Sequence, residues 1–585
     1  MNKRNFYCVA AVLVITCSIT LPSTAQILER DTCRPSSVPD PTVATYDYVI
    51  ITLDDMLEGL SDFKNWKESL GFSVHSVTTS WIAEAYQGND LPEKIRNFLI
   101  DSYLDWNIKY VLIAGSRDTI PMRTCISFSK YHDDEFLQCP TDYYYADLTG
   151  EWDSDGDGYY GEYKQDDMDF YPEVIVGRIP CDTLETLERA LNNTIKYESS
   201  EGNWKNNVLL LGAVIFYENQ DASGYIWERS DGATLMEEVR RDLFEPHSYQ
   251  CMRMYEEEGI RPTTYDYDKA LTRENVLAEW TNGYGIVDML GHAGNTLITR
   301  LVWTEDDGDN IPEYPGELEY PPFLRISDSD DIATLFPPIV YSSGCGQLRT
   351  SYNLGRSCIE DGSAVAFVGT TQGSWYDECL KWDDKSDGGT YSLNYYFFEN
   401  LVDHQQSCGN ALYSAKMLYY NRFWYHGYDT NWIFRAYDNM YSLTLYGDPS
   451  LGLYERSSDP EQPSQPEGPP QGKRGMSYNY KTSSTDPDGD VVRYLFDWGD
   501  RSSTLTEYIP SGETVTCSHT WKSQGDFAVR VRCEDIHGSW SAWSDPLSIT
   551  IPKGRILVRW LHLSEKLRLL FDIVHENYSV TRLTS

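Results

Sequence analysis

Apolar runs alternate with segments of helical periodicity from residue 46 to about residue 455. We expect strands at 48–53, 72–77, 110–115, 174–178, 208–212, 285–290, 338–341 and 364–369, and helices at 56–70, 91–106 and 184–197. Most of these strands are continuously apolar, which indicates that both of their faces are covered, and their alternation with helices is typical of a parallel sheet. The pattern predicts an α/β fold with a doubly wound, mostly parallel sheet.

The pattern changes after residue 455. Residues 456–475 are rich in Ser, Pro, Gly and Gln and are predicted to form a linker. Short alternating strands follow at 491–496, 514–518, 527–533 and 547–551, which predicts a small all-β sandwich over 476–552. Cys517 and Cys533 lie symmetrically about the turn near Gly525, so a disulfide between them is possible. A basic, leucine-rich tail over 553–585 has helical spacing and would either pack on the protein or touch a membrane surface.

The first residues have the features of a secretory signal. Lys3 and Arg4 precede an apolar run, and small residues end at Ala25, so residues 1–25 are expected to be removed and the protein is expected to be secreted, extracellular or on the cell surface. No later stretch has 18 consecutive apolar residues, which predicts that no helix spans a membrane. The α/β region is expected to comprise an N-terminal subdomain, 40–200, and a catalytic subdomain, 201–455.

Charge and cysteine content narrow the possible partners. The 48 basic and 90 acidic residues give a net charge of -42, which argues against nucleic acid as a partner because phosphate contacts need clustered Lys and Arg. Of the 13 cysteines, two lie in the signal, and the remaining 11 are an odd number. In an oxidising compartment at least one of them is free or pairs between chains, and we expect Cys345 to be the free thiol.

An acidic loop interrupts the α/β pattern. Asp153, Asp155 and Asp157 alternate with small residues and are followed by Gly158. Such a loop suits calcium, a hard cation that takes six to eight oxygen ligands, and Glu162 is a candidate fourth ligand. The twelfth position is Lys164, so the loop is not an EF-hand. We predict a structural calcium ion and no organic cofactor; the alternative is a solvated acidic turn.

Two predicted strands end in residues that carry chemistry. His292 follows the strand at 285–290, and Cys345 follows the strand at 338–341. Reactive side chains of α/β sheets lie beyond the carboxyl ends of strands, where an imidazole can take the proton of a thiol whose pKa is ordinarily about 8.5. Gly291 and Gly344 would let a substrate backbone approach closely. The pattern therefore predicts a Cys-His dyad, against the alternative of a buried structural Cys and a hydrogen-bonded structural His.

The order and spacing of motifs over about residues 46–451 resemble the gingipain-like cysteine peptidases of the caspase-type clan. The motifs are Trp66-Lys67, Gly177-Arg178-Ile179-Pro180, Tyr197-Glu198, Gly291-His292, Ser343-Gly344-Cys345, the segment 362–369 and Gly447-Asp448-Pro449-Ser450-Leu451. The resemblance implies a caspase-like sheet, with Cys345 as nucleophile and His292 as base.

The same resemblance implies roles for two acidic residues. Glu218 matches the carboxylate that steadies the His, and Asp231 matches the S1-pocket acid, which would favour a basic P1 residue. The chain departs from the family pattern at Ala293, where the family usually has Gly directly after the His. An alanine still supplies an amide donor for an oxyanion but adds a methyl group beside the scissile carbonyl.

The sandwich resembles a PKD-type, immunoglobulin-like module through Asp486-Pro487-Asp488-Gly489-Asp490 and Asp497-Trp498-Gly499-Asp500. Two functions are compatible with the whole sequence. The first is a secreted cysteine endopeptidase that acts on protein or peptide substrates. The second is a catalytically inert cell-surface binding or adhesion protein that uses calcium loops and the PKD-type module.

Overall fold

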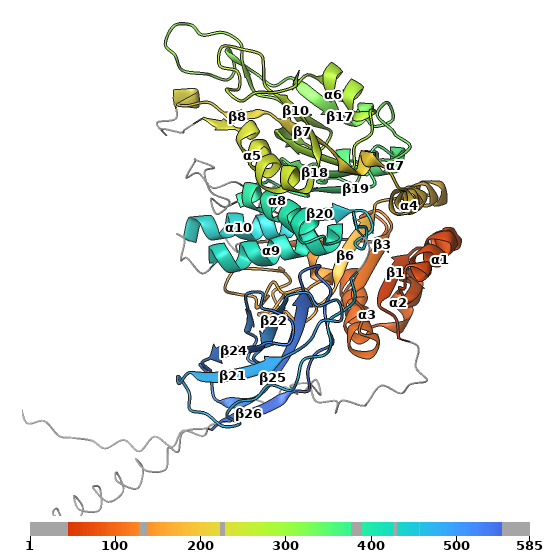
Figure 1. Cartoon of the computed structure of the whole chain (residues 1–585), viewed down its shortest axis with the longest axis vertical. Helices are drawn as coiled ribbons and strands as arrows, with labels where there is room; N and C mark the ends of the chain where they lie inside the picture. Colours follow the sequence, from red (N-terminus) through yellow and green to blue (C-terminus); the bar gives the residue numbers. More distant parts are fainter. Residues whose placement is uncertain are drawn as a thin grey trace, which may run out of the picture. The chain divides into compact units, whose positions relative to one another are not determined.

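The computed structural model describes residues 45–127, 138–222, 229–375, 389–424, 430–454 and 457–552 (Figure 1). The predicted signal, 1–25, and the predicted tail, 553–585, lie outside these residues. Among the residues described, no helix is both long and apolar enough to cross a membrane.

One mixed sheet organises the α/β part (Figure 1). Within the described residues it has eleven strands. Their order is β11 (Lys269–Ala270), β10 (Gln250–Tyr255), β7 (Asn207–Gly212), β12 (Ile286–Leu290), β18 (Ile339–Ser343), β19 (Ala366–Thr370), β20 (Leu443–Tyr446), β6 (Ile175–Ile179), β3 (Tyr110–Ala114), β1 (Tyr48–Thr52) and β2 (Val74–Thr78). All neighbouring pairs are parallel except β19 and β20. The predicted mostly parallel sheet is confirmed.

The helices of the described residues include the three that were predicted and others that were not. They are α1 (Ser61–Ser69), α2 (Thr79–Ala85), α3 (Leu91–Trp106), α4 (Leu184–Ser199), α5 (Gly232–Val239), α6 (Arg273–Trp280), α7 (Leu354–Asp361), α8 (Gly389–Phe398), α9 (Cys408–Trp424) and α10 (Thr430–Ser442). The helix predicted at 56–70 begins as a 3₁₀ segment, Asp54–Leu60, and is α-helical only from Ser61. Helix α3 has the predicted bounds because Asp90 accepts a hydrogen bond from the Glu93 N–H at its start and Asn107 adopts the left-handed conformation at its end.

Motifs that are far apart in the sequence meet at a buried ion network beside the sheet. The Lys67 ammonium is fully buried and lies 2.7 Å from Glu198 Oε1 and 2.5 Å from Asp448 Oδ2. Trp66 Nε1 donates to Glu198 Oε2 at 2.7 Å, and the Tyr48 hydroxyl donates to Asp448 Oδ1 at 2.7 Å. The network joins α1, α4 and the turn after β20. A buried ammonium group needs carboxylates beside it, which explains why Lys67, Glu198 and Asp448 occur together here.

Short antiparallel sheets accompany the large one. They consist of β4 (Arg123–Cys125) with β5 (Cys139–Thr141), β8 (Val214–Phe216) with β9 (Ser230–Asp231), β15 (Val302–Trp303) with β16 (Leu318–Glu319), and β13 (His292–Gly294), β14 (Leu297–Thr299) and β17 (Pro322–Arg325) in one three-stranded sheet. Strands β8 and β13 carry residues of the candidate site, so these additions shape the sheet edge at which it lies.

The C-terminal part is all-β, as predicted. One sheet pairs β21 (Tyr478–Ser483) with β24 (Thr514–His519), and the other contains β23 (Ser503–Leu505), β22 (Val492–Asp497), β25 (Gly525–Asp535) and β26 (Leu547–Ile551). Trp498 is fully buried in the core between them, as expected. Together with the α/β sheet, these strands confirm the predicted fold class.

Two expectations about this part need correction. Cys517 and Cys533 are free thiols, and they do not face each other across a hairpin, because Cys517 pairs with Tyr480 in one sheet whereas Cys533 pairs with Tyr494 in the other. The segment predicted as a linker is hydrogen-bonded to the sandwich between residues 461 and 472; for example, Glu467 pairs with Lys481. This stretch of the predicted linker therefore belongs to the sandwich.

Candidate active site

The strands β12 and β18 lie side by side and bring the two predicted catalytic residues to one edge of the sheet. Leu290 pairs with Ser343, and His292 and Cys345 each follow two residues later. The backbones beyond the strands are closely packed: a Cβ atom added to Gly344 would lie 2.7 Å from the Ala293 Cβ and 2.9 Å from the Gly291 carbonyl oxygen. Only glycine fits there, because real Cβ atoms do not approach that closely.

The His292 imidazole is oriented by the backbone. Its Nε2 lies 2.7 Å from the carbonyl oxygen of Ile215, the middle residue of β8. A carbonyl only accepts hydrogen bonds, so Nε2 carries the proton and Nδ1 is left with the lone pair of a base. The rings of Phe216 and Tyr320 flank the imidazole with centroids 5.4 Å away. Desolvation by these surroundings lowers the pKa of His292, and the bond to Ile215 raises it in part.

Cys345 lies in a loop that is anchored on both sides. The N–H of Gly344 donates to the Ser342 carbonyl and that of Gly346 to the Gln372 carbonyl, whereas the Cys345 N–H makes no hydrogen bond to the described residues. Its sulfur lies 3.4 Å from the Ser374 N–H, which donates to it. Although the residue is exposed, the protein around the thiol raises its pKa by desolvation, and the backbone contact with Ser374 lowers it in part.

These shifts leave both groups uncharged at neutral pH. The pKa of the thiol lies above its ordinary value, and the pKa of the imidazole lies below its own. The arrangement therefore suits general-base catalysis, in which the proton moves during attack, rather than a preformed thiolate-imidazolium pair. The free amide of Cys345 is a suitable donor for a developing oxyanion.

Glu218 does not occupy the position expected of it. Its carboxylate is 61% exposed and lies 3.6 Å from the Arg261 guanidinium, and the partner of His292 is instead the carbonyl of Ile215. The chain turns after Phe216, so the Glu218 side chain points to a different set of neighbours. No sequence signal identifies Ile215, because the group that acts is a backbone carbonyl.

Asp231 lies near the dyad but is already paired. It begins α5, where its Oδ1 accepts a hydrogen bond from the Ala233 N–H at 3.1 Å. Its Oδ2 accepts bonds from Arg229 Nη2 at 3.0 Å and from Thr263 Oγ1 at 2.9 Å. Strand β9, which carries Asp231, pairs with β8. The Ile215 carbonyl of β8 accepts the hydrogen bond from His292.

A buried polar group below the dyad was not predicted. Asp288 and Tyr341 are neighbours in the β12–β18 register, and Asn394 of α8 donates to Asp288 Oδ1 at 2.8 Å and to Ser343 Oγ at 3.2 Å. Burial raises the pKa of Asp288 to about 8, and the bond from Asn394 lowers it in part. The sequence feature that could have indicated this buried group is a single aspartate inside an otherwise apolar strand.

The structure assembles three of the four predicted calcium ligands. Carboxylate oxygens of Asp153, Asp155 and Asp157 lie within 4.8 Å of one another. Glu162 is not part of this group: its side chain is buried and accepts a hydrogen bond from Gln165 Nε2 at 3.3 Å. The donor set, carboxylate oxygens on a turn with Gly156 in the left-handed region, fits a hard cation.

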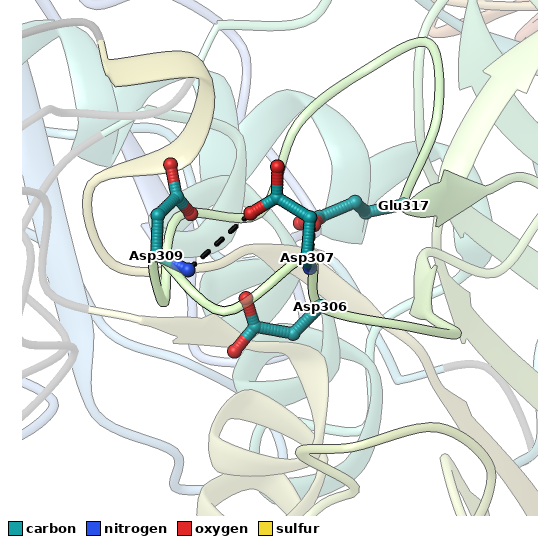
Figure 2. Close-up of side chains that lie close together, drawn as sticks. All are labelled: Asp306, Asp307, Asp309 and Glu317. Carbon is teal, nitrogen blue, oxygen red and sulfur yellow. Dashed lines mark hydrogen bonds between the residues drawn. The ribbon is translucent and has the colours of Figure 1, made fainter.

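Two further acidic groups have the same character. Figure 2 shows Asp306, Asp307 and Asp309 on one turn, with Glu317 reaching toward them from a neighbouring segment. Glu317 is held by donors on the protein, since its Oε1 accepts the Asp307 N–H at 2.6 Å and its Oε2 accepts Trp303 Nε1 at 3.1 Å. The third group is Asp486, Asp488 and Asp490 in the sandwich. The Asp-Gly-Asp pattern of residues 155–157 recurs at residues 307–309, and this repeat could have identified the group around Asp306 from the sequence.

Comparison with known proteins gives two family matches. The sequence model of peptidase family C25 matches residues 42–454, and that of the PKD domain matches residues 466–545. Together these matches cover both the α/β part and the sandwich.

Individual relatives are distant. Gingipain R2 of Porphyromonas gingivalis is 20% identical over 252 residues, which cover 42% of this chain and 28% of that protein. The solved structure of the Arg-specific cysteine proteinase gingipain R has 13% identity and a TM-score of 0.48, covering 88% of this chain and 100% of that one. A PKD domain of an M14-like peptidase from Thermoplasmatales archaeon SCGC AB-540-F20 is 37% identical, with a TM-score of 0.16, and covers 17% of this chain and 100% of that one. The chain thus matches little more than a quarter of the length of its curated gingipain relative.

Proposed function

The chain belongs to peptidase family C25, as a gingipain-like protein with a PKD domain, and we propose that it is a cysteine endopeptidase that hydrolyses peptide bonds through Cys345 and His292. The observation that carries this proposal is the β12–β18 register, which brings the two residues to adjacent strand ends. The packing of Gly344 against Ala293 and Gly291 supports it, because it keeps the segments that carry Cys345 and His292 close to each other.

The mechanism follows from the two uncharged groups. His292 takes the thiol proton on its Nδ1 as the sulfur of Cys345 attacks the scissile carbonyl, while Nε2–H keeps its bond to Ile215. The Cys345 amide donates to the oxyanion of the tetrahedral intermediate. The imidazolium then protonates the leaving amine, and the same imidazole activates the water that hydrolyses the thioester.

Single and double substitutions test this mechanism. Residues that act as one unit are not additive, so Cys345→Ala, His292→Ala and the double variant should all fall to about the same residual kcat/KM on a peptide library. Glu218→Gln is the matched control and should keep kcat within about twofold, because the carboxylate is exposed and pairs with Arg261, while His292 is bonded to the Ile215 carbonyl. Activity that survives His292→Ala or thiol alkylation would contradict the assignment, whereas failure of the unsubstituted chain to cleave any peptide would favour the inert binding protein.

Two finer points concern location and specificity. Secretion rests on the signal features of residues 1–25. The family resemblance implies a preference for basic P1 residues through Asp231, and this preference requires a carboxylate that is free to pair with substrate, whereas Asp231 is engaged by Arg229 and Thr263. Protein or peptide substrates follow from the family.

We also propose that Asp153, Asp155 and Asp157 hold a structural calcium ion. Three carboxylates within 4.8 Å repel one another, and a divalent cation would offset that repulsion while binding the hard oxygen ligands it prefers. The ion would stabilise this loop and takes no part in the proposed hydrolysis.

A further inference from the structure

Asp231 is already engaged by donors of the chain itself. One carboxylate oxygen accepts the Ala233 N–H, and the other accepts both Arg229 and Thr263. The pair is largely shielded from water, with 7% of the Asp231 side chain and 19% of the Arg229 side chain exposed. A substrate guanidinium or ammonium group would have to displace Arg229 or lie beside its positive charge, and like charges in a shielded site disfavour each other.

This ion pair lies at the candidate active site. Gly232 packs so closely on β12 that an added Cβ would lie 2.9 Å from Leu290 Cδ2, two residues before His292. The hydroxyl groups of Ser230 and Tyr391 lie 3.2 Å apart. Burial raises the pKa of Tyr391, and negative charge on Asp231 and Cys345 adds to the effect, so Tyr391 lies within electrostatic reach of both residues.

The Arg229 guanidinium retains a donor for a ligand. It lies over the ring of Tyr217, with 5.7 Å between the guanidinium carbon and the ring centroid. Its Nε is buried and has no hydrogen-bond partner among the described residues. An unsatisfied buried donor is costly, so an oxygen acceptor on a bound substrate would be stabilised there.

On the premise of the peptidase function proposed above, we propose that Arg229 is a specificity-determining residue. It neutralises Asp231 and so directs the site away from Arg and Lys at P1 and toward neutral side chains that end in a hydrogen-bonding oxygen. The basic preference implied by the family resemblance is therefore suppressed in this chain by one residue two positions before the pocket acid.

Binding of benzamidine, a cationic amidine, tests the ion pair without any need for turnover. In the Cys345→Ala protein we expect weak binding, and in Cys345→Ala with Arg229→Gln we expect binding at least about tenfold tighter, because Asp231 is then free to pair with the probe. Arg229→Lys keeps the charge and should leave the affinity unchanged. Adding Asp231→Asn to the Arg229→Gln protein should abolish the gain, and the Asn oxygen still accepts the Ala233 N–H, so α5 keeps its cap.

Cleavage then tests specificity in the protein with its thiol intact. Two peptides that differ only in Arg or citrulline at P1 have side chains of nearly the same shape, and citrulline is neutral and ends in an oxygen. We expect the unsubstituted chain to favour citrulline in kcat/KM and Arg229→Gln to shift the ratio toward Arg by at least about tenfold.

The outcomes separate the two proposals. Cleavage with an unchanged P1 ratio, or a benzamidine affinity that ignores Arg229→Gln, overturns the role of Arg229. A gain that persists with Asp231→Asn overturns it as well, since the probe would then bind elsewhere. Failure to cleave any peptide while the benzamidine pattern holds refutes the peptidase function and leaves the charge-matching role of Arg229 supported.

Discussion

Asp288 is a carboxyl group whose surroundings oppose its charge. It is fully buried, its pKa is raised to about 8 by desolvation, and its Oδ2 has no hydrogen-bond partner among the described residues. In the unfolded chain an aspartate has a pKa of about 3.9. Between these values the folded chain holds a proton that the unfolded chain releases, so this residue makes folding less favourable as pH rises, by up to about 1.4 kcal/mol per pH unit.

Asp288→Asn should therefore stabilise the protein, and more so at higher pH. The amide has nearly the same shape, is never charged and keeps an oxygen for Asn394. We expect the gain in free energy of unfolding to be about 1.5 kcal/mol at pH 5 and to reach about 5 kcal/mol near pH 8, measured by urea unfolding at both values. Asp330→Asn, at an exposed position, is the matched control and should show no such trend. A gain that is independent of pH would mean that Asp288 is charged in the folded protein.

At the scale of elements, the loop after β18 is shaped by a close approach of backbones. Gly344 meets Ala293 and Gly291, whereas a Cβ added to Gly294 would meet nothing within 4 Å. Gly344→Ala should therefore push the two strand ends apart, cost about 1–3 kcal/mol of stability, and lower kcat/KM at least about a hundredfold, since small displacements of catalytic groups are costly.

Gly294→Ala is the control for that prediction, because it adds the same methyl group in open space on the same turn. We expect its unfolding midpoint and kcat/KM to stay close to those of the unsubstituted chain. Equal effects of the two substitutions, measured by thermal unfolding and peptide cleavage, would show that the close approach at Gly344 does not matter for the site.

The sequence predicts elements well where a single local signal determines them. Strand β12 and helix α3 follow from apolar runs and capping residues, and the two strand ends predicted to carry His292 and Cys345 are neighbours in the sheet. The antiparallel strand β20 was missed because four residues that directly follow a helix carry no turn signal. Glu218 was placed wrongly because the course of a loop after Phe216 decides its neighbours, and the actual partner of His292 is a backbone carbonyl without any sequence signature.

For the whole molecule, negative charge is the dominant electrostatic feature. A net charge of -42 disfavours a compact state through self-repulsion, and the described residues gather part of that charge into three turns of closely spaced carboxylates. Two of these turns lie in the α/β part and one lies in the sandwich. Divalent cations would act on stability through such turns, whereas monovalent salt would only screen the exposed charges.

Chelation of calcium tests the predicted loop against this background. A ligand that binds only the folded state at a hundred times its Kd adds about 2.7 kcal/mol, so transfer from calcium to a chelator at constant ionic strength should lower Tm by a few degrees. Asp155→Ala should remove most of this response, and Asp330→Ala should keep it, because that exposed aspartate lies outside all three groups. If the response survives Asp155→Ala, calcium binds at one of the other two groups and the prediction for residues 153–157 is wrong. If Tm does not respond to calcium in the unsubstituted chain, the acidic loop is a solvated turn and its charge is tolerated because water, rather than an ion, surrounds it.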